Sequence, residues 1–226
     1  MRPRLYLLLL SLAAPGLPTP GLAGELAILE RPIRYDEERV QLTIAYIQRH
    51  YGLAVRDVRI VPQAIVIHWT GTPSLKAIWN GFNRVLIRGS RRDLARGGPL
   101  NVSAHVLVGR DGTVYRLMPE GWMARHCIGL NYDSIGIENV GDGSRHPLTD
   151  EQLAANAALI RYLAAKHPIR YLIGHFESRQ FEGSPLFRER DPTYRTAKAD
   201  PGRSFMRRLR ARLKDLGLLA SYKSTQ

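Results

Sequence analysis

Residues 60–69 read I-V-P-Q-A-I-V-I-H-W, a run dominated by isoleucine and valine. These apolar residues follow no helical period, which predicts a strand that is covered on both faces, with Pro62 marking its start. The stretches 134–140 and 169–173 predict two further strands. Shorter apolar runs at 104–108 and 113–117 flank the sequence G-R-D-G, which indicates a β-hairpin.

Helical patterns alternate with these strands. Each has apolar residues at a spacing of three or four, and the first three also have a capping signal. Their predicted limits are Asp36 to Gly52, a start at Thr72 or Ser74, Thr149 to His167, and about 204 to 216. Strands mixed with helices, together with a hairpin, predict an α/β fold: a single domain with a central mixed β-sheet flanked by helices.

The composition excludes several classes of protein. The chain has 226 residues, of which 44% are hydrophobic and 23% charged, as in a folded globular protein. Cys127 is the single cysteine, so a disulfide framework and a cysteine-rich zinc site are both excluded. Any metal must be held by histidines and carboxylates. The formal charge of +13 predicts attraction to a polyanion, but charge alone does not choose between nucleic acid, an anionic membrane and an acidic polymer.

The N-terminus has the pattern of a secretory signal peptide. Arg2 and Arg4 precede the apolar run 5–14, and a Pro/Gly-rich stretch ends with the small residues Gly21 and Ala23. We expect cleavage after Ala23, which makes 1–23 the signal peptide. The run is shorter than the roughly 20 residues of a transmembrane helix, although an uncleaved anchor is an alternative. The expected location is therefore the periplasm or the extracellular space, with no stable membrane insertion after cleavage.

Three predicted strands end in side chains that can exchange protons or bind a metal. They are His68, Glu138 and His175. Ligands collect at the carboxyl ends of strands in open α/β sheets, so we expect these residues to converge. In K-A-D-P-G, an extended backbone would place Lys198 and Asp200 on the same side. Two imidazoles and one carboxylate, with a fourth position open, form the pattern of a catalytic zinc site, and Glu138 would then be free to act as a base.

Each of these residues also has a structural interpretation. A histidine at a strand end is often a hydrogen-bonded core residue, and D-P-G is also a turn signature. His105 is interpreted as core, with a spare ligand or a substrate contact as alternatives. His126 and Cys127 are adjacent, and neighbouring residues on a strand point to opposite faces, which argues against joint metal binding. His50 is expected to be solvated.

Six segments taken in order resemble the zinc-dependent N-acetylmuramoyl-L-alanine amidases of the type-2 class, relatives of the peptidoglycan recognition proteins. The segments are I-V-I-H-W-T, N-V-S-A-H-V-L-V-G-R-D-G-T-V-Y-R-L, A-R-H-C-I-G, D-S-I-G-I-E-N-V-G, I-G-H and K-A-D-P-G. The resemblance runs from about residue 60 to 205. It implies the fold of that family and assigns a 24–59 N-terminal segment with a helix, a 60–217 amidase catalytic domain and a 218–226 C-terminal tail.

The resemblance also implies roles for individual residues. Its zinc ligands match His68, His175 and Asp200, its catalytic glutamate matches Glu138, and its active-site lysine matches Lys198. His126 and Asn131 match positions near the substrate, and His105 is the third candidate for substrate binding. The implied reaction is zinc-dependent hydrolysis of the amide between the lactyl group of N-acetylmuramic acid and L-alanine of the stem peptide, with Glu138 as general base and Lys198 as oxyanion stabiliser.

Two departures from the family pattern shape these expectations. Some members use a tyrosine that corresponds to Ala104, so the implied mechanism here depends on Glu138. Residues 176–197 form a segment longer than in compact members, which predicts a functional loop and adds Glu177, Glu182 and Asp191 as rival ligands. The expected partner is peptidoglycan or its muropeptides, and the signal peptide argues against nucleic acid. The alternative is a non-catalytic peptidoglycan-binding module. The sequence does not indicate an oligomeric state.

Overall fold

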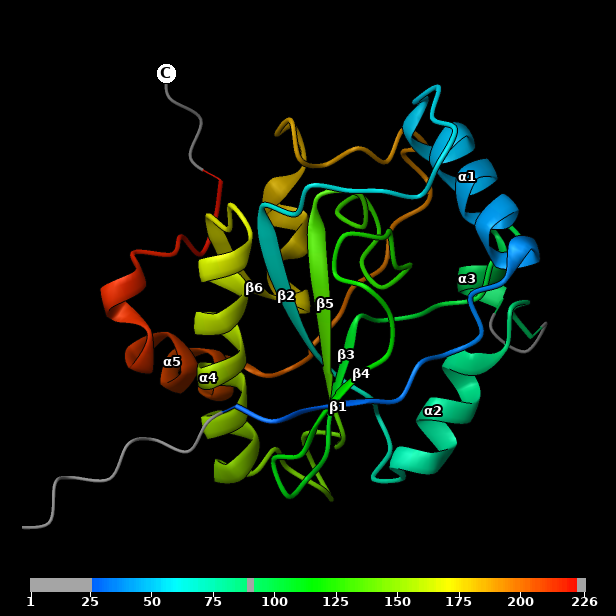
Figure 1. The fold of residues 1–226 in the computed structure, drawn as a ribbon. Coiled ribbons are helices and arrows are strands. Elements are labelled where there is room, and N and C mark those ends of the chain that lie inside the picture. The colour runs from blue at the N-terminus through cyan, green and yellow to red at the C-terminus, as the bar shows by residue number, and fades with distance from the viewer. Residues whose placement is uncertain (1–25, 89–91, 223–226) are drawn as a thin grey trace, which may run out of the picture.

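The computed structural model describes residues 26–88 and 92–222, and its centre is a six-stranded mixed sheet (Figure 1). The strands are β1 (Ile28–Glu30), β2 (Ala64–Trp69), β3 (Val106–Val108), β4 (Val114–Arg116), β5 (Ser134–Asn139) and β6 (Tyr171–Gly174). Their order across the sheet is β1-β4-β3-β5-β2-β6. Only the β3–β4 hairpin is antiparallel among the strand pairs of this sheet, so the predicted mixed α/β sheet is confirmed.

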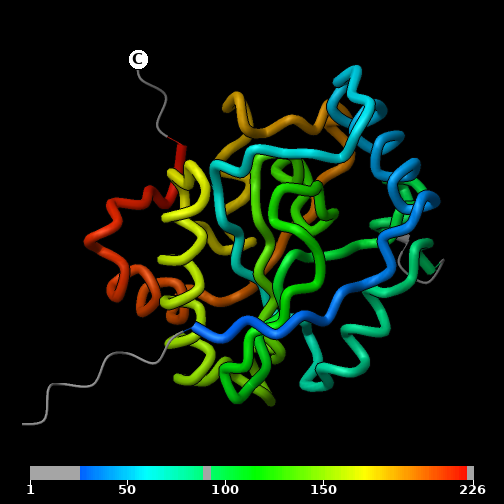
Figure 2. Tube along the Cα trace, in the orientation of Figure 1, coloured from blue at the N-terminus to red at the C-terminus, as the bar shows by residue number. Residues whose placement is uncertain are grey.

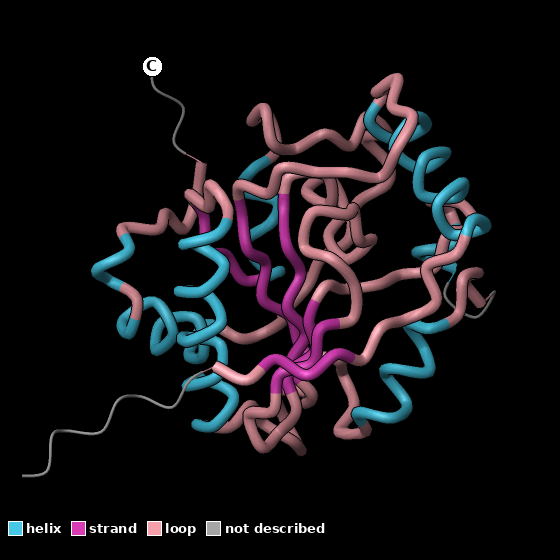
Figure 3. The backbone as a smooth tube through the Cα atoms, viewed as in Figure 1, coloured by secondary structure: helices cyan, strands magenta, loops and turns pink. Residues whose placement is uncertain are grey.

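Helices surround the sheet (Figures 1 and 3). They are α1 (Glu37–Tyr51), α2 (Leu75–Asn83), α3 (Arg92–Ala95), α4 (Asp150–Lys166) and α5 (Arg203–Arg212), with the short 3-10 helices η1 (His175–Phe181) and η2 (Lys214–Leu216). Helices α4 and α5 pack against one face of the sheet through Leu159, Leu163 and Leu209. Figure 2 follows the N-terminal segment across the sheet edge, where β1 pairs with β4, to α1.

Successive side chains of β2 point to opposite faces of the sheet, so one face carries the core with α4 and α5 and the other carries His68. Ile65 and Ile67 lie in the core cluster with α4 and α5. Ala64 and Val66 point to the other face, where they pack with Cys127 and Leu130 in a second cluster. Because side chains two residues apart share a face, His68 lies on the same face as Ala64 and Val66.

Most predicted ends of helices are confirmed by capping contacts. The Asp36 carboxylate accepts from the Arg39 backbone N–H, and Gly52 ends α1 with φ +65°. Thr149 and Gln152 form the reciprocal capping box of α4, and His167 is its C-cap. The C-terminal helix is shorter than predicted, because α5 ends at Arg212 and a 3-10 turn follows.

The start predicted for the strand at 60–69 is wrong. Pro62 has no N–H, and the Ile60 N–H donates to the Gly121 carbonyl, so regular pairing begins only at Ala64. Residues 176–197 were predicted as a long loop, but the first part belongs to η1. The short elements β1 and α3 were not predicted, since three or four residues carry no readable period.

Some predictions fall outside the described residues. These are the signal peptide 1–23 and the end of the tail, 223–226. Within residues 26–88 and 92–222, no helix is both long enough and apolar enough to span a membrane.

Candidate metal centre

Three adjacent parallel strands carry His175, His68 and Glu138 to one level at their carboxyl ends. His68 is directly opposite Glu138 in the β2–β5 register. Ile67 is opposite Gly174 in the β2–β6 register. The residues that follow them, His68 and His175, therefore lie side by side. The convergence expected from the strand ends therefore results from register in the order β5-β2-β6.

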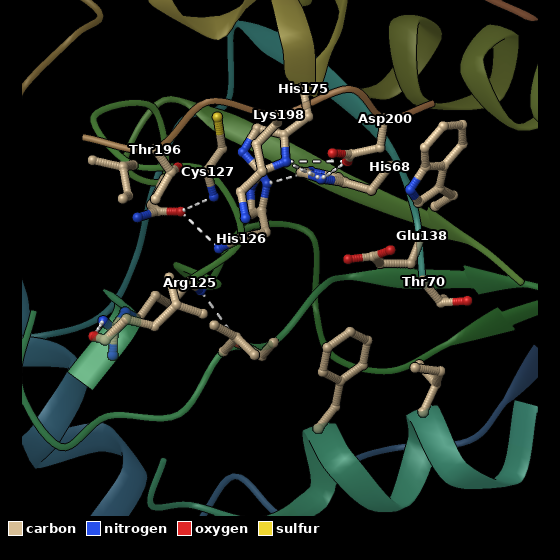
Figure 4. Close-up of a pocket in the computed structure, with 18 of the residues that line it drawn as sticks. His68, Thr70, Arg125, His126, Cys127, Glu138, His175, Thr196, Lys198 and Asp200 are labelled. Carbon is tan, nitrogen blue, oxygen red and sulfur yellow. Dashed lines mark hydrogen bonds and ion pairs between the residues drawn. The ribbon is translucent and has the colours of Figure 1, made fainter. Parts of the chain in front are cut away.

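Asp200 joins the two histidines from the segment that precedes α5. The Phe176 N–H donates to the Asp200 carbonyl at 3.1 Å, which holds this segment against the residue after His175. The Asp200 Oδ2 lies 3.2 Å from His68 Nδ1 and 3.1 Å from His175 Nδ1, and the two Nδ1 atoms are 3.0 Å apart (Figure 4). All three side chains are buried.

This donor set fits a divalent cation. In a tetrahedral zinc site with bonds of about 2.0–2.1 Å, ligand atoms lie about 3.3–3.4 Å apart, close to the separations seen here. Three atoms with lone pairs that face one another in a buried position need a positive charge between them or shared protons. Among the residues that the structure describes, His68, His175 and Asp200 are the one group of this kind whose ligand atoms all lie within 4.8 Å.

The three groups shift one another's pKa values. Burial and repulsion from His175 lower the pKa of His68 to about 4, despite the Asp200 carboxylate. Burial alone would raise the pKa of Asp200, but hydrogen bonds from His175 and His68 outweigh it and hold the pKa far below its usual range. Burial would lower the pKa of His175, but Cys127 and Asp200 raise it to about 10. The Asp200 carboxylate therefore stays ionised beside a protonated His175, and a cation bound here would replace the His175 proton.

The three residues form one end of a pocket of about 160 Å³. Glu138 and Lys198 line the same pocket and are both half-buried. Figure 4 shows the Glu138 carboxylate apart from the three-residue group, on the side of the strand β5. The apolar part of the wall comes from α2, α3 and the segment before β3 through Ile78, Phe82, Leu94 and Val102.

The rival acidic ligands are engaged elsewhere. Glu177 forms an ion pair with Arg210 and accepts from the Gly174 N–H. Glu182 pairs with Arg179, and Asp191 accepts from the Thr193 N–H and hydroxyl. Asp200 is therefore the carboxylate beside the two histidines.

Asn131 and His126 both line the pocket, and both have structural partners. His126 Nδ1 lies 3.0 Å from His68 Nε2. The Asn131 Oδ1 accepts from the backbone N–H groups of His126 at 2.7 Å and Cys127 at 2.6 Å, and its Nδ2 donates to the Tyr51 hydroxyl at 2.9 Å. The Asn131 amide thus holds the backbone of His126 and Cys127, which form part of the pocket wall, against Tyr51 of α1.

His105 does not line the pocket. It is fully buried, its Nδ1 accepts from the Gly136 N–H at 2.9 Å, and its Nε2 donates to the Trp122 carbonyl at 2.8 Å. Burial lowers its pKa to about 4. These contacts favour the core interpretation of His105 over a role in substrate binding, because both ring nitrogens already bind the backbone.

Two further expectations are corrected. Residues 126 and 127 are not in a strand, and both side chains line the pocket, so the alternation argument does not apply to them. His50 is buried rather than solvated: its Nδ1 contacts Glu189 at 2.9 Å and its Nε2 donates to the Gly97 carbonyl at 3.0 Å. Through this contact the 182–197 segment packs against α1.

Tyr194 and Arg125 also line the pocket. The Arg125 guanidinium donates to the backbone carbonyls of Leu94, Gly98 and Leu100 and to the Tyr194 hydroxyl. It therefore joins the segments around α3 to the 182–197 segment. No local pattern in the sequence signals this role, because its partners are 25 to 69 residues away.

The chain is similar to known proteins in sequence and in fold. A family profile described as N-acetylmuramoyl-L-alanine amidase matches residues 58–203. The N-acetylmuramoyl-L-alanine amidase LysC from Clostridium intestinale URNW superposes with a TM-score of 0.50 at 22% identity, over 83% of this chain and 97% of that chain, which shows the shared fold. Bumblebee PGRP-SA gives a TM-score of 0.49 at 19% identity, covering 87% of this chain and 99% of that one. A selenomethionine derivative of AmpD gives 0.48 at 28% identity, covering 67% and 84%. No curated protein matches the chain.

Proposed function

Since the chain belongs to the N-acetylmuramoyl-L-alanine amidase family, we propose that it hydrolyses the amide between the lactyl group of N-acetylmuramic acid and L-alanine of the peptidoglycan stem peptide, with zinc held by His68, His175 and Asp200. The observation that carries this proposal is the buried group of three donor atoms 3.0–3.2 Å apart, at one end of a pocket that also contains a carboxylate and an amine.

Hydrolysis of an unactivated amide needs a nucleophile, a stabiliser of the oxyanion and a proton for the leaving nitrogen. Zinc bound by these three residues would supply a Lewis acid and an acidified water. Glu138 is beside His68 in register and lines the pocket, so its carboxylate would take a proton from the attacking water and return it to the L-alanine nitrogen. Lys198 would stabilise the negative charge on the amide oxygen.

The competing function is a non-catalytic module that binds peptidoglycan. Loss of a metal ligand or of the base would favour it. In this chain all three ligand candidates and Glu138 are present and line one pocket, which supports the enzyme.

The proposed location is the periplasm or the extracellular space. The N-terminal pattern of two arginines, an apolar run and a small-x-small site supports export. The formal charge of +13 suits a wall polymer with stem-peptide carboxylates.

The test is digestion of purified soluble muropeptides by the mature protein, with products identified by mass. The expected product is an intact stem peptide with a free L-alanine amino terminus, and both a chelator and Glu138→Gln should abolish it. Muropeptides that stay intact while binding to zinc-loaded protein would refute the enzyme and support the binding module.

A further inference from the structure

The outer nitrogens of the two histidine ligands face two residues that are adjacent in the sequence. His68 and His175 both present Nδ1 to the metal position. His68 Nε2 lies 3.0 Å from His126 Nδ1, with the rings edge to face at 89°. Figure 4 shows the Cys127 side chain beside the His175 ring, and Nε2 is the ring nitrogen on that side because Nδ1 faces Asp200. Figure 4 shows His126 and Cys127 on the same side of the metal-binding group.

The hydrogen-bond chain through His126 is consistent with only one arrangement of protons when a metal is bound. A metal ligand needs a free lone pair on His68 Nδ1, so the proton of that ring is on Nε2 and is donated to His126 Nδ1. The proton of His126 is then on its Nε2, which lies 3.4 Å from the Ser134 carbonyl, an atom that only accepts. For His175, the same logic places the ring proton on Nε2, on the side of the Cys127 sulfur.

The His126–Cys127 pair is itself held in place. The single Asn131 Oδ1 accepts from both of their backbone N–H groups, and Asn131 is in turn held by Tyr51 on α1. On the sheet side the His126 ring lies over Gly136, where an added Cβ would be 2.6 Å from the ring carbon Cγ. This glycine leaves the space that the His126 ring occupies.

We propose that His126 and Cys127 are positioning residues that hold His68 and His175 with Nδ1 toward the metal, and thereby raise the affinity of the site for zinc. This inference rests on the metal-dependent function proposed above. Outer partners of metal-bound histidines typically change metal affinity by about 10–100-fold. A residue that only contacts the substrate would leave zinc affinity unchanged.

The test measures zinc affinity without substrate, by competition with a chromophoric chelator, and records the visible spectrum of the cobalt-loaded protein. His126→Asn places an amide oxygen near the position of the imidazole Nδ1, whereas His126→Gln keeps the amide but extends it by one methylene. We expect His126→Asn to bind zinc within a few-fold of the wild type and His126→Gln to bind about 10–100-fold more weakly. Cys127→Ser keeps an acceptor and should bind more tightly than Cys127→Ala.

His146→Ala is the matched control, because His146 is a half-exposed histidine that contacts Asp142 and does not line the pocket. It should leave zinc affinity and the cobalt spectrum unchanged. Equal affinity in the Asn and Gln variants at residue 126, together with equal affinity in the Ser and Ala variants at residue 127, would overturn the inference. Thermal unfolding of each variant is the control that the compared proteins are folded.

The result is separable from the proposed function. Failure to cleave muropeptides by a protein that shows the expected order of zinc affinities would refute the amidase and leave the positioning role intact. If the wild type cleaves muropeptides and all four variants at residues 126 and 127 bind zinc equally well, the positioning role alone is refuted.

Discussion

Gly136→Ala provides a test of the outer partner of His68 without altering any polar side chain. In the β2–β5 register Gly136 is opposite Val66, and the His126 ring covers it. A Cβ at this position would lie 2.6 Å from Cγ, 2.8 Å from Nδ1 and 2.9 Å from Cδ2 of His126. The whole near edge of the ring would therefore have to move.

The size of the displacement follows from these distances. An ordinary carbon contact begins near 3.5 Å, so the ring must move by about 1 Å. The contact of His126 Nδ1 with His68 Nε2 is 3.0 Å, and a movement of that size away from the sheet takes it beyond hydrogen-bonding distance. We expect zinc affinity to fall about 10–100-fold, which corresponds to about 1.4–2.7 kcal/mol.

The assay is competition with a chromophoric chelator, paired with chemical denaturation of the metal-free protein. Overpacking at Gly136 should also lower the free energy of unfolding by about 1–3 kcal/mol. Gly81→Ala is the control, because a Cβ there meets nothing within 4 Å. If Gly136→Ala is destabilised yet binds zinc within twofold of the wild type, the link between His126 and the metal ligand is refuted.

Four further predictions concern the ligands, the catalytic groups and pH. Asp200→Ala should retain less zinc than the wild type after gel filtration, and equal zinc content by metal analysis would remove Asp200 from the ligand set. Glu138→Gln should keep its zinc but hydrolyse soluble muropeptide at least about 100-fold more slowly, and a wild-type initial rate would argue against a base at this position. Lys198→Met should lower kcat about 100–1000-fold with a smaller change in KM, whereas a change confined to KM would indicate substrate binding only. Burial lowers the pKa of His105 to about 4 from 6.5, so the stability it contributes is present above pH 6.5 and is lost as the pH falls toward 4. His105→Asn should make the free energy of unfolding less dependent on pH over this interval. If urea denaturation gives the same pH dependence for the variant and the wild type, His105 is not its source.

The strand-end residues were predictable from the sequence because the signal is local. A short apolar run that ends in His68 or Glu138 indicates a buried strand. It also shows that the polar side chain lies at the carboxyl end of that strand. Because adjacent parallel strands end at the same edge of the sheet, these side chains come together there. Asp200 was predicted from the resemblance and from the motif K-A-D-P-G, in which an extended backbone places it on the same side as Lys198.

The positions of His105, His126 and Cys127 were not predictable in the same way. The pattern of the sequence predicted a strand over 104–108 that contains His105, but not that both ring nitrogens bind backbone groups of Gly136 and Trp122. The 126–127 segment has no strand geometry, so the period of two gave the wrong relation between its side chains. Their orientation depends on Asn131 and on the space above Gly136.

By itself, the sequence determined the mixed α/β class, the capped ends of α1 and α4, and the kinds of side chain that could hold a metal, since periodicity, capping and donor chemistry depend on residues close together in the chain. Only the tertiary structure decided which acid joins His68 and His175 and which residues contact their outer ring nitrogens. It also decided that the contact of His50 with Glu189 attaches the 182–197 segment to α1. These contacts join residues 25 to 139 positions apart, and their geometry is set by the packing of the whole sheet and its loops rather than by any local pattern.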